Sequence, residues 1–174
     1  RRETKINQLG VEVPRKILGD IEAKVMDSLI ESEVIVLAGS LPPETPTDFY
    51  QKLIAKTKEN GGKVFLDTSL APLKVSLRAK PTLIKPNIRE LGEIYNRELS
   101  LRDAIEVSQE LVEEGIEIVV VSMGAEGAIL TTTAGSLQVI PPRVEVTSTV
   151  GAGDSMVGAI AVAYLNNYSL EKTA

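Results

Sequence analysis

The sequence predicts an α/β protein with a mostly parallel central β-sheet flanked by helices. Short aliphatic runs such as Val34–Leu37 and Ile118–Val121 are typical of strands buried on both faces. Segments with apolar residues at helical spacing alternate with these runs, and such alternation favours parallel strands joined by helices. Aromatic residues make up only 3% of the chain and Trp is absent, which suits a core of Val, Ile, Leu and Ala. The 174 residues can bury one core, so a single domain over residues 1–174 is expected.

The individual elements follow from local patterns of apolar, proline and glycine residues. Pro14 suits the first turn of a helix, and the apolar residues Ile17, Ile21 and Val25 form one stripe behind it. Glycines and prolines mark the ends of elements, and residues 67–81 show no clear period. The expected elements are, in order, a helix from Pro14, a strand at Val34–Leu37, a helix from Thr47 to about Asn60, strands at Val64–Leu66 and Leu83–Ile84, helices from Asn87 to about Tyr95 and from Leu101 to Glu114, a strand at Ile118–Val121, antiparallel strands at Ala128–Thr131 and Leu137–Ile140, and a helix at Asp154–Leu165.

Charge and composition exclude several classes of function. The formal net charge is −5, so no broadly basic surface for nucleic acid is expected, although a few converging Lys or Arg side chains can still bind an anionic substrate. The chain has no Cys and no His, which excludes disulfides and thiol chemistry and leaves a carboxylate or Lys as any general base. No apolar run reaches transmembrane length, and no signal peptide is visible at the start. We expect a cytoplasmic protein with no membrane partner.

The most informative motif is STVGAGDSMVGA, at Ser148–Ala159. Gly151 and Gly153 have no Cβ, so the backbone can turn sharply there and approach a ligand closely. The amides of Gly151, Ala152 and Gly153 would then point outward where a helix begins, and such amides bind anions. Asp154 lies at the rim of this pocket, where a carboxylate can act as general base for a hydroxyl that attacks a phosphate. An ordinary strand-to-helix turn, with Asp154 as a favourable first-turn residue, explains the same spacing equally well.

A second motif, KPNIRE, follows the strand expected at residues 83–84. Pro86 holds Lys85 extended, so its ammonium can project toward a phosphate. Asn87 and Glu90 share one helical face, and their oxygens are the donors that Mg²⁺ or its bound waters require. Asn87 as N-cap and Glu90 at the third helical position also make a capping box, which is the commoner explanation of such a pair. The two roles are compatible, because a capped helix start orients both side chains.

Two further glycine-containing segments follow expected strands. GSLPP contains Gly39, which permits close approach, and Ser40, whose hydroxyl can donate to a phosphate or sugar oxygen. SMGAEG contains Ser122, Gly124 and Gly127, whose backbone amides can face a nucleotide phosphate. Taken separately, each segment is better explained as a simple strand exit or turn. Together they gain weight, because ligands bind at the carboxyl ends of the strands in open α/β sheets.

In this order, GSLPP, KPNIRE, SMGAEG and STVGAGDSMVGA resemble the PfkB family of carbohydrate kinases, which has the ribokinase-like fold. With TKIN at Thr4–Asn7 and NREL at Asn96–Leu99, the chain is most similar to the phosphofructokinase and tagatose-6-phosphate kinase branch. The resemblance implies transfer of a phosphoryl group from ATP, with Mg²⁺, to a hydroxyl of a hexose phosphate. Fructose 6-phosphate, fructose 1-phosphate and tagatose 6-phosphate all remain open as acceptors. A homodimer is the assembly that the resemblance suggests.

The resemblance also assigns roles residue by residue. It implies Asp154 as the catalytic base and the amides of Gly151, Ala152 and Gly153 as an anion hole for the transferred phosphoryl group. Asn87 and Glu90 would organise Mg²⁺, mainly through water. The remaining implied contacts are Lys85 on the nucleotide phosphates, Ser122, Gly124, Gly127 and Thr149 in the nucleotide pocket, Gly39 and Ser40 on the phosphate of the acceptor, and Lys5 and Asn7 on the sugar.

The chain departs from the family in extent, because family members carry a further N-terminal half with sugar-binding residues and a small β-sheet lid. The expected kinase domain is therefore a C-terminal two-thirds, incomplete at both ends, and residues 1–174 alone are expected to be a poor kinase. A non-catalytic binding or assembly fragment of the same fold is the alternative. A dinucleotide-binding domain fits less well, because Met156 stands where its fingerprint needs a third glycine and Asp154 follows the turn directly instead of about 20 residues later.

Overall fold

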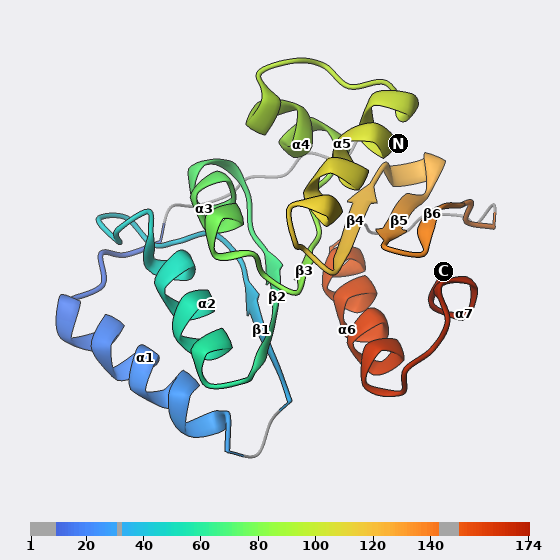
Figure 1. Cartoon of the computed structure of the whole chain (residues 1–174). Coiled ribbons are helices and arrows are strands. Elements are labelled where there is room, and N and C mark those ends of the chain that lie inside the picture. The colour runs from blue at the N-terminus through green and yellow to red at the C-terminus, as the bar shows by residue number, and fades with distance from the viewer. Residues whose placement is uncertain (1–9, 31–32, 143–149) are drawn as a thin grey trace.

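One β-sheet organises the computed structural model, which describes residues 10–30, 33–142 and 150–174. The strands are β1 (Val34–Ala38), β2 (Lys63–Asp67), β3 (Leu83–Ile84), β4 (Ile118–Ser122), β5 (Ala128–Thr132) and β6 (Gly135–Val139). They lie in this order across the sheet, as Figure 1 shows. β1 to β4 run parallel, and β5 and β6 extend the sheet in antiparallel pairs. The predicted α/β fold with a mostly parallel sheet is confirmed.

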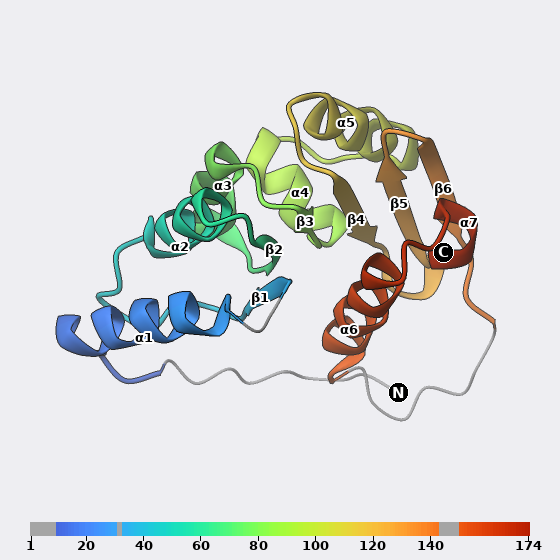
Figure 2. The same ribbon diagram turned by 60° about the horizontal axis from the view of Figure 1, so that its bottom comes forward.

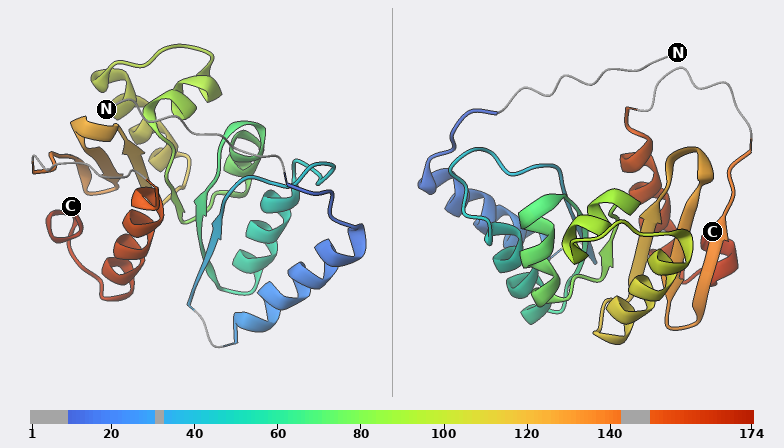
Figure 3. Two further views of the ribbon diagram at one scale, coloured as in Figure 1. Left: turned by 180° about the vertical axis from the view of Figure 1, so that it is seen from behind. Right: turned by 90° about the horizontal axis from the view of Figure 1, so that it is seen from above.

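Helices cover both faces of this sheet. They are α1 (Arg15–Ser28), α2 (Phe49–Glu59), α3 (Leu70–Ser76), α4 (Ile88–Tyr95), α5 (Leu101–Glu113), α6 (Ala152–Leu165) and α7 (Leu170–Thr173). Figure 2 shows α2 to α5 along one face and α6 on the opposite face. α1 lies beside α2 at the β1 end of the sheet, which both views of Figure 3 show.

The alternation of side chains along the central strands builds two hydrophobic cores. Val64 and Leu66 of β2 point into the core beneath α2 to α5, whereas Phe65 between them points toward α6. In β4, Val119 and Val120 divide between the two cores in the same way. All five side chains are essentially buried, so these strands need apolar residues at every position.

The structure differs from the sequence-based prediction after β2 and at α6. Residues 67–81, which lack a clear period, contain α3 and a 3₁₀ turn at Leu77–Ala79. Ser69 is the N-cap of α3 but makes no capping hydrogen bond through its side chain, and Leu70, the first residue of the helix, has a φ of +57°. α6 begins at Ala152 instead of Asp154, because Gly151 is its N-cap. The short helix α7 is also absent from the prediction.

Apolar side chains remain exposed on the face of the sheet that α6 covers. α6 is apolar around most of its circumference: Val157 and Ile160 are buried against the sheet, while Val162 and Leu165 are 58% and 46% exposed. Val36 on β1 is 47% exposed, and β1 pairs only with β2 among the described residues. No helix in the described ranges is long and apolar enough to cross a membrane.

Candidate functional site

The carboxyl ends of the four parallel strands meet at one edge of the sheet. Asp67 ends β2 and Ser122 ends β4, while Gly39 and Lys85 directly follow β1 and β3. Backbone hydrogen bonds join these ends: the Gly39 amide donates to the Asp67 carbonyl over 2.9 Å, and the Ser122 amide donates to the Pro86 carbonyl over 3.0 Å. Motifs that are far apart in the sequence therefore lie side by side in the fold.

Lys85 is enclosed at the centre of this edge, with only 8% of its surface exposed. Its Nζ lies 3.1 Å from Oδ2 of Asp67. A Cβ built on Gly153 would lie 2.9 Å from the same Nζ, closer than a carbon atom normally approaches nitrogen. The Lys85 ammonium therefore rests directly against the backbone at the start of α6, and the absence of a side chain at residue 153 makes this contact possible.

The start of α6 presents free backbone amides beside the ammonium. Gly151, the N-cap, has a φ of +80°, which glycine adopts at no steric cost. Its carbonyl accepts from the Ser155 amide at 2.9 Å, so the amides of Ala152, Gly153 and Asp154 have no partner within the helix. The Asp154 carboxylate is exposed and makes no hydrogen bond or ion pair with the described residues. This turn therefore combines unpaired amides, a neighbouring positive charge and an unengaged carboxylate.

Asn87 and Glu90 form the capping box at the start of α4. Asn87 Oδ1 accepts from the amides of Arg89 and Glu90 at 3.0 Å, and Glu90 Oε2 accepts from the Asn87 amide at 2.9 Å. The structural explanation of this motif is therefore right. The box leaves Glu90 Oε1 for another partner.

The donor set near α4 fits Mg²⁺ only with help from water and phosphate oxygens. Across the part of the chain that the structure describes, no three carboxylate, His or Cys side chains cluster as a metal site. Mg²⁺ in phosphoryl-transfer sites is commonly held by one or two carboxylates, several waters and the phosphates themselves. One free oxygen on Glu90 satisfies that pattern.

The segment after β1 is held by its neighbours. The Gly39 carbonyl accepts from Thr68 Oγ1 at 2.8 Å and from the Tyr50 hydroxyl at 3.2 Å. Burial raises the pKa of Tyr50 above its usual 10.0, which extends the pH range over which this hydroxyl stays protonated and can donate. Ser40 is exposed and has no partner among the described residues, so its hydroxyl is available to a ligand.

The loop after β4 closes a turn into β5. The Met123 amide donates to the Gly127 carbonyl at 2.8 Å, and the Gly127 amide donates to the Gly124 carbonyl at 3.1 Å. A Cβ on Gly127 would lie 1.8 Å from the Val139 carbonyl oxygen, so packing against β6 requires glycine there. Gly124 is exposed and has open space around it, which leaves its backbone accessible to a ligand.

Sequence reasoning misses Asp67 as a member of this cluster. The signal that could have found it is a carboxylate at the carboxyl end of a buried parallel strand, followed by two hydroxyl side chains at Thr68 and Ser69. Three residues that were predicted from the sequence, Lys5, Asn7 and Thr149, lie outside the described residues.

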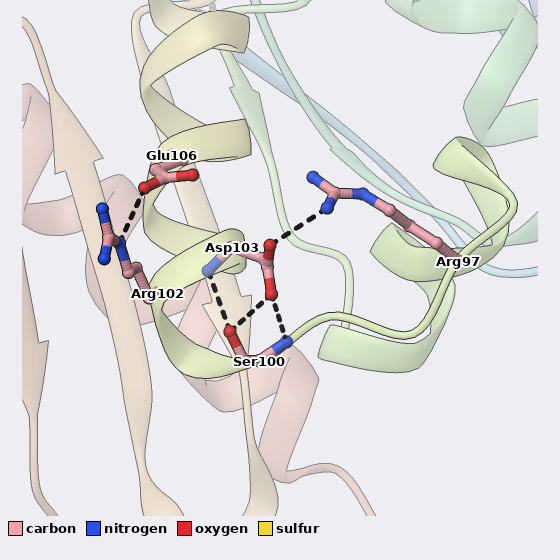
Figure 4. A network of polar contacts seen from close by, with 5 residues as sticks. All are labelled: Arg97, Ser100, Arg102, Asp103 and Glu106. Atoms are coloured by element: carbon pink, nitrogen blue, oxygen red, sulfur yellow. Dashed lines mark hydrogen bonds and ion pairs between the residues drawn. The ribbon is translucent and has the colours of Figure 1, made fainter.

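A cavity of about 860 Å³ lies beside α4 and its connection to α5. Arg89 and Arg97 are among its lining residues, and none of the predicted site residues lines it. Figure 4 shows the network next to it, in which the Asp103 carboxylate accepts from the Ser100 amide and from Arg97, each at 3.0 Å. The bonds from Ser100, and then the charge of Arg97, lower the pKa of Asp103. This network caps α5 and explains the polar residues there without a ligand.

Comparison with known proteins gives consistent matches over nearly the whole chain. The family described as "pfkB family carbohydrate kinase" matches residues 16–174. The 1-phosphofructokinase of Rhodobacter capsulatus is 36% identical over 173 residues, which are 98% of this chain and 55% of that protein. The 1-phosphofructokinase of Escherichia coli K12 is 37% identical over 174 residues, with the same shares of the two chains.

A solved structure agrees with these relatives. The crystal structure of phosphofructokinase-2 from Escherichia coli in complex with substrates and products has a TM-score of 0.89 and 36% identity, and the match covers 96% of this chain and 55% of that one. The chain therefore spans about half the length of the relatives that it matches. The ribokinase-like expectation agrees with this likeness, and the dinucleotide-binding alternative finds no support in it. Since the family match covers all but the first residues, the chain belongs to the pfkB family of carbohydrate kinases.

Proposed function

We propose that this chain carries the phosphoryl-transfer centre of an ATP-dependent kinase that acts on a hydroxyl group of a hexose phosphate. One observation carries the proposal: the turn at residues 151–154 holds unpaired amides and the free Asp154 carboxylate, with the Lys85 ammonium against Gly153. Amides and an ammonium bind negatively charged oxygens, whereas the carboxylate can accept a proton. A kinase needs both functions at one point, and the family supports the same reaction.

In the proposed reaction the acceptor hydroxyl oxygen attacks the γ-phosphorus of ATP. A new P–O bond forms as the bond from that phosphorus to the β–γ bridging oxygen breaks, and this oxygen leaves with ADP. The proton of the hydroxyl passes to the Asp154 carboxylate and later to water. The amides of Ala152 and Gly153 and the positive end of α6 stabilise charge on the transferred phosphoryl oxygens. Lys85 binds phosphate oxygens beside them, so the chain contributes mainly position and charge, as phosphoryl transfer requires.

Asn87 and Glu90 are the residues that would hold Mg²⁺, with waters between. The ion, when bound, neutralises charge on the nucleotide phosphates. The capping box contributes to this role because it prevents both side chains from rotating away, while Glu90 Oε1 stays available. Ser122 and Gly124 lie across from this helix start, since Asn87 and Ser122 form a β-bridge, and they would line the nucleotide side.

The relatives support a phosphorylated ketohexose as the acceptor. The curated relatives are named 1-phosphofructokinase, and one solved neighbour, 34% identical, was determined with fructose-6-phosphate. The exposed Ser40 hydroxyl and the Gly39 backbone would bind the phosphate that the acceptor already carries. Fructose 1-phosphate is the first acceptor to test, followed by fructose 6-phosphate and tagatose 6-phosphate.

The test is a coupled assay of ADP release by the native protein with ATP, Mg²⁺ and each sugar phosphate in turn. Asp154→Asn keeps the size of the side chain but removes the base, so kcat should fall by roughly 100- to 10,000-fold while nucleotide binding survives. Glu106→Gln is the control, because Glu106 is an exposed carboxylate in the middle of α5, 2.9 Å from Arg102. Unchanged turnover in Asp154→Asn would refute its role as base. A native protein that binds ATP and sugar phosphate but transfers nothing would favour the non-catalytic binding module.

A further inference from the structure

Asp67 is the charged strand-end side chain to which the proposed reaction gives no task. It ends β2, which lies between β1 and β3 in the sheet. Its side chain is 20% exposed, and its Oδ2 lies 3.1 Å from Lys85 Nζ. The same oxygen would lie 3.9 Å from a Cβ on Gly153. The Asp67 carboxylate, the Lys85 ammonium and the start of α6 are therefore packed as one unit.

The backbone around Asp67 also holds the segment that would bind the acceptor. The Asp67 carbonyl accepts from the Gly39 amide at 2.9 Å. The hydroxyl of the next residue, Thr68, is buried and donates to the Gly39 carbonyl at 2.8 Å. Two hydrogen bonds thus tie residues 67–68 to the Gly39 segment, while an ion pair ties them to Lys85. The same two residues connect the acceptor side with the nucleotide side.

We propose that Asp67 is a positioning residue for phosphoryl transfer, one that holds the Lys85 ammonium against Gly153 at a fixed distance from the Gly39 segment. This inference rests on the proposed kinase function. A lysine side chain has four rotatable bonds, and its ammonium is a point charge with no preferred direction, so it needs a partner to hold one position. The Asp67 carboxylate supplies that partner before any ligand binds. Since the pair is enclosed, salt screens it little.

The charge of Asp67 predicts a response that simple damage to the fold would not produce. A carboxylate close to bound phosphates repels them, so its contribution must come through Lys85. Removing the charge should therefore leave nucleotide binding unchanged or tighter, while the freed ammonium no longer stays in place for the transfer step. Loss of packing, in contrast, weakens binding and activity together. The two explanations differ in the direction of the change in nucleotide affinity.

The experiment compares Asp67→Asn, Lys85→Met and the double variant in the native protein, with ATP, Mg²⁺ and the acceptor that the wild type uses. For Asp67→Asn we expect kcat to fall about tenfold or more, because misplacing a reacting group by about 1 Å can cost roughly 100-fold. The Kd for ADP, measured by calorimetry, should not weaken. The double variant should be no slower than Lys85→Met, because Asp67 acts through the lysine. Glu106→Gln, which removes an ion pair of similar length at 2.9 Å on α5, should keep wild-type kcat.

The outcomes distinguish a failure of the positioning role of Asp67 from a failure of the proposed kinase function. Two results would overturn this inference alone, provided that the wild type is active. One is an Asp67→Asn variant with unchanged kcat, and the other is a double variant in which the two losses of kcat are additive. A wild type that transfers no phosphoryl group overturns the proposed function, and this inference with it. If Asp67→Asn does not fold, Asp67→Glu takes its place. Its extra methylene pushes the ammonium away from its present position while the charge is kept, so kcat should still fall; a wild-type kcat there would overturn the inference.

Discussion

Gly153→Ala separates the stability of the fold from the geometry of the site. The added methyl carbon would lie 2.9 Å from Lys85 Nζ and 3.5 Å from its Cε. Non-bonded atoms of this kind normally stay about 3.5 Å apart, so the ammonium must move by roughly 0.6 Å. A movement of this size away from residue 153 lengthens the 3.1 Å pair with Asp67 or turns the ammonium toward solvent.

The expected cost in stability is small. With an effective dielectric constant of about 20, lengthening the ion pair by roughly 0.6 Å loses about 0.9 kcal/mol. Alanine favours a helix over glycine by up to about 1 kcal/mol, so the two effects nearly cancel. The midpoint of thermal unfolding should therefore change by less than about 3 °C. Activity is more sensitive to position, because a displacement of about 1 Å can cost roughly 100-fold, so kcat/KM should fall about tenfold.

The assay measures ADP release and thermal unfolding, by circular dichroism, on the same preparations. Gly158→Ala is the matched control: it lies in the same helix, and a Cβ there would meet nothing within 4 Å. It should raise the unfolding midpoint slightly and leave kcat/KM unchanged. A Gly153→Ala variant with wild-type kcat/KM would show that the contact between Lys85 and Gly153 is not needed for the reaction. A large fall in its midpoint would show that the contact serves the fold instead.

Two further predictions concern the sheet. Gly127→Ala should lower the free energy of unfolding by at least about 3 kcal/mol, because its Cβ would lie 1.8 Å from the Val139 carbonyl oxygen and push β5 from β6. Urea denaturation measures this free energy, and a loss below about 1 kcal/mol would contradict the prediction. Glu117→Gln should alter the pH dependence of stability, because the hydrogen bond from Lys63 to Glu117, at 2.6 Å, raises the pKa of Lys63 above its usual 10.5. A raised lysine pKa adds stability that is fully present below about pH 10.5 and is lost as the pH rises through the raised value. The gap in unfolding midpoint between wild type and Glu117→Gln should thus shrink at high pH, and a constant gap would contradict the assignment.

β2 and β4 could be predicted from the sequence because they are buried on both faces, whereas the same prediction is wrong for β1, in which only Leu37 is buried. β2 and β4 extend the aliphatic runs at Val64–Leu66 and Ile118–Val121 by no more than one residue at either end. α3 could not be predicted, because its first residue, Leu70, has a left-handed backbone that local propensity disfavours. Tertiary packing of Leu73 into the core overrides that preference.

The site was accessible to sequence reasoning only in part. Each motif carries its own local signal, and the capping box of Asn87 and Glu90 is visible from spacing alone. The pairing of Asp67 with Lys85 is not, because it depends on the register that sets Leu66 opposite Ile84. Register between parallel strands is fixed by the whole sheet and by no short stretch of sequence.

The exposed apolar residues of α6 and the edge of β1 that is unpaired among the described residues are surfaces through which two molecules can meet as the protein is concentrated. Among the described residues β1 has one partner strand, and an unpaired strand edge can add another extended chain. Encounters between two molecules increase with the square of concentration, whereas the unfolding of one molecule does not depend on it. The net charge of −5 slows such encounters, but its reach is about 8 Å at physiological salt. Measurements at several protein concentrations therefore distinguish the two states. A thermal unfolding midpoint or a turnover number that changes on dilution is a property of an assembly, and one that stays constant is a property of the single chain.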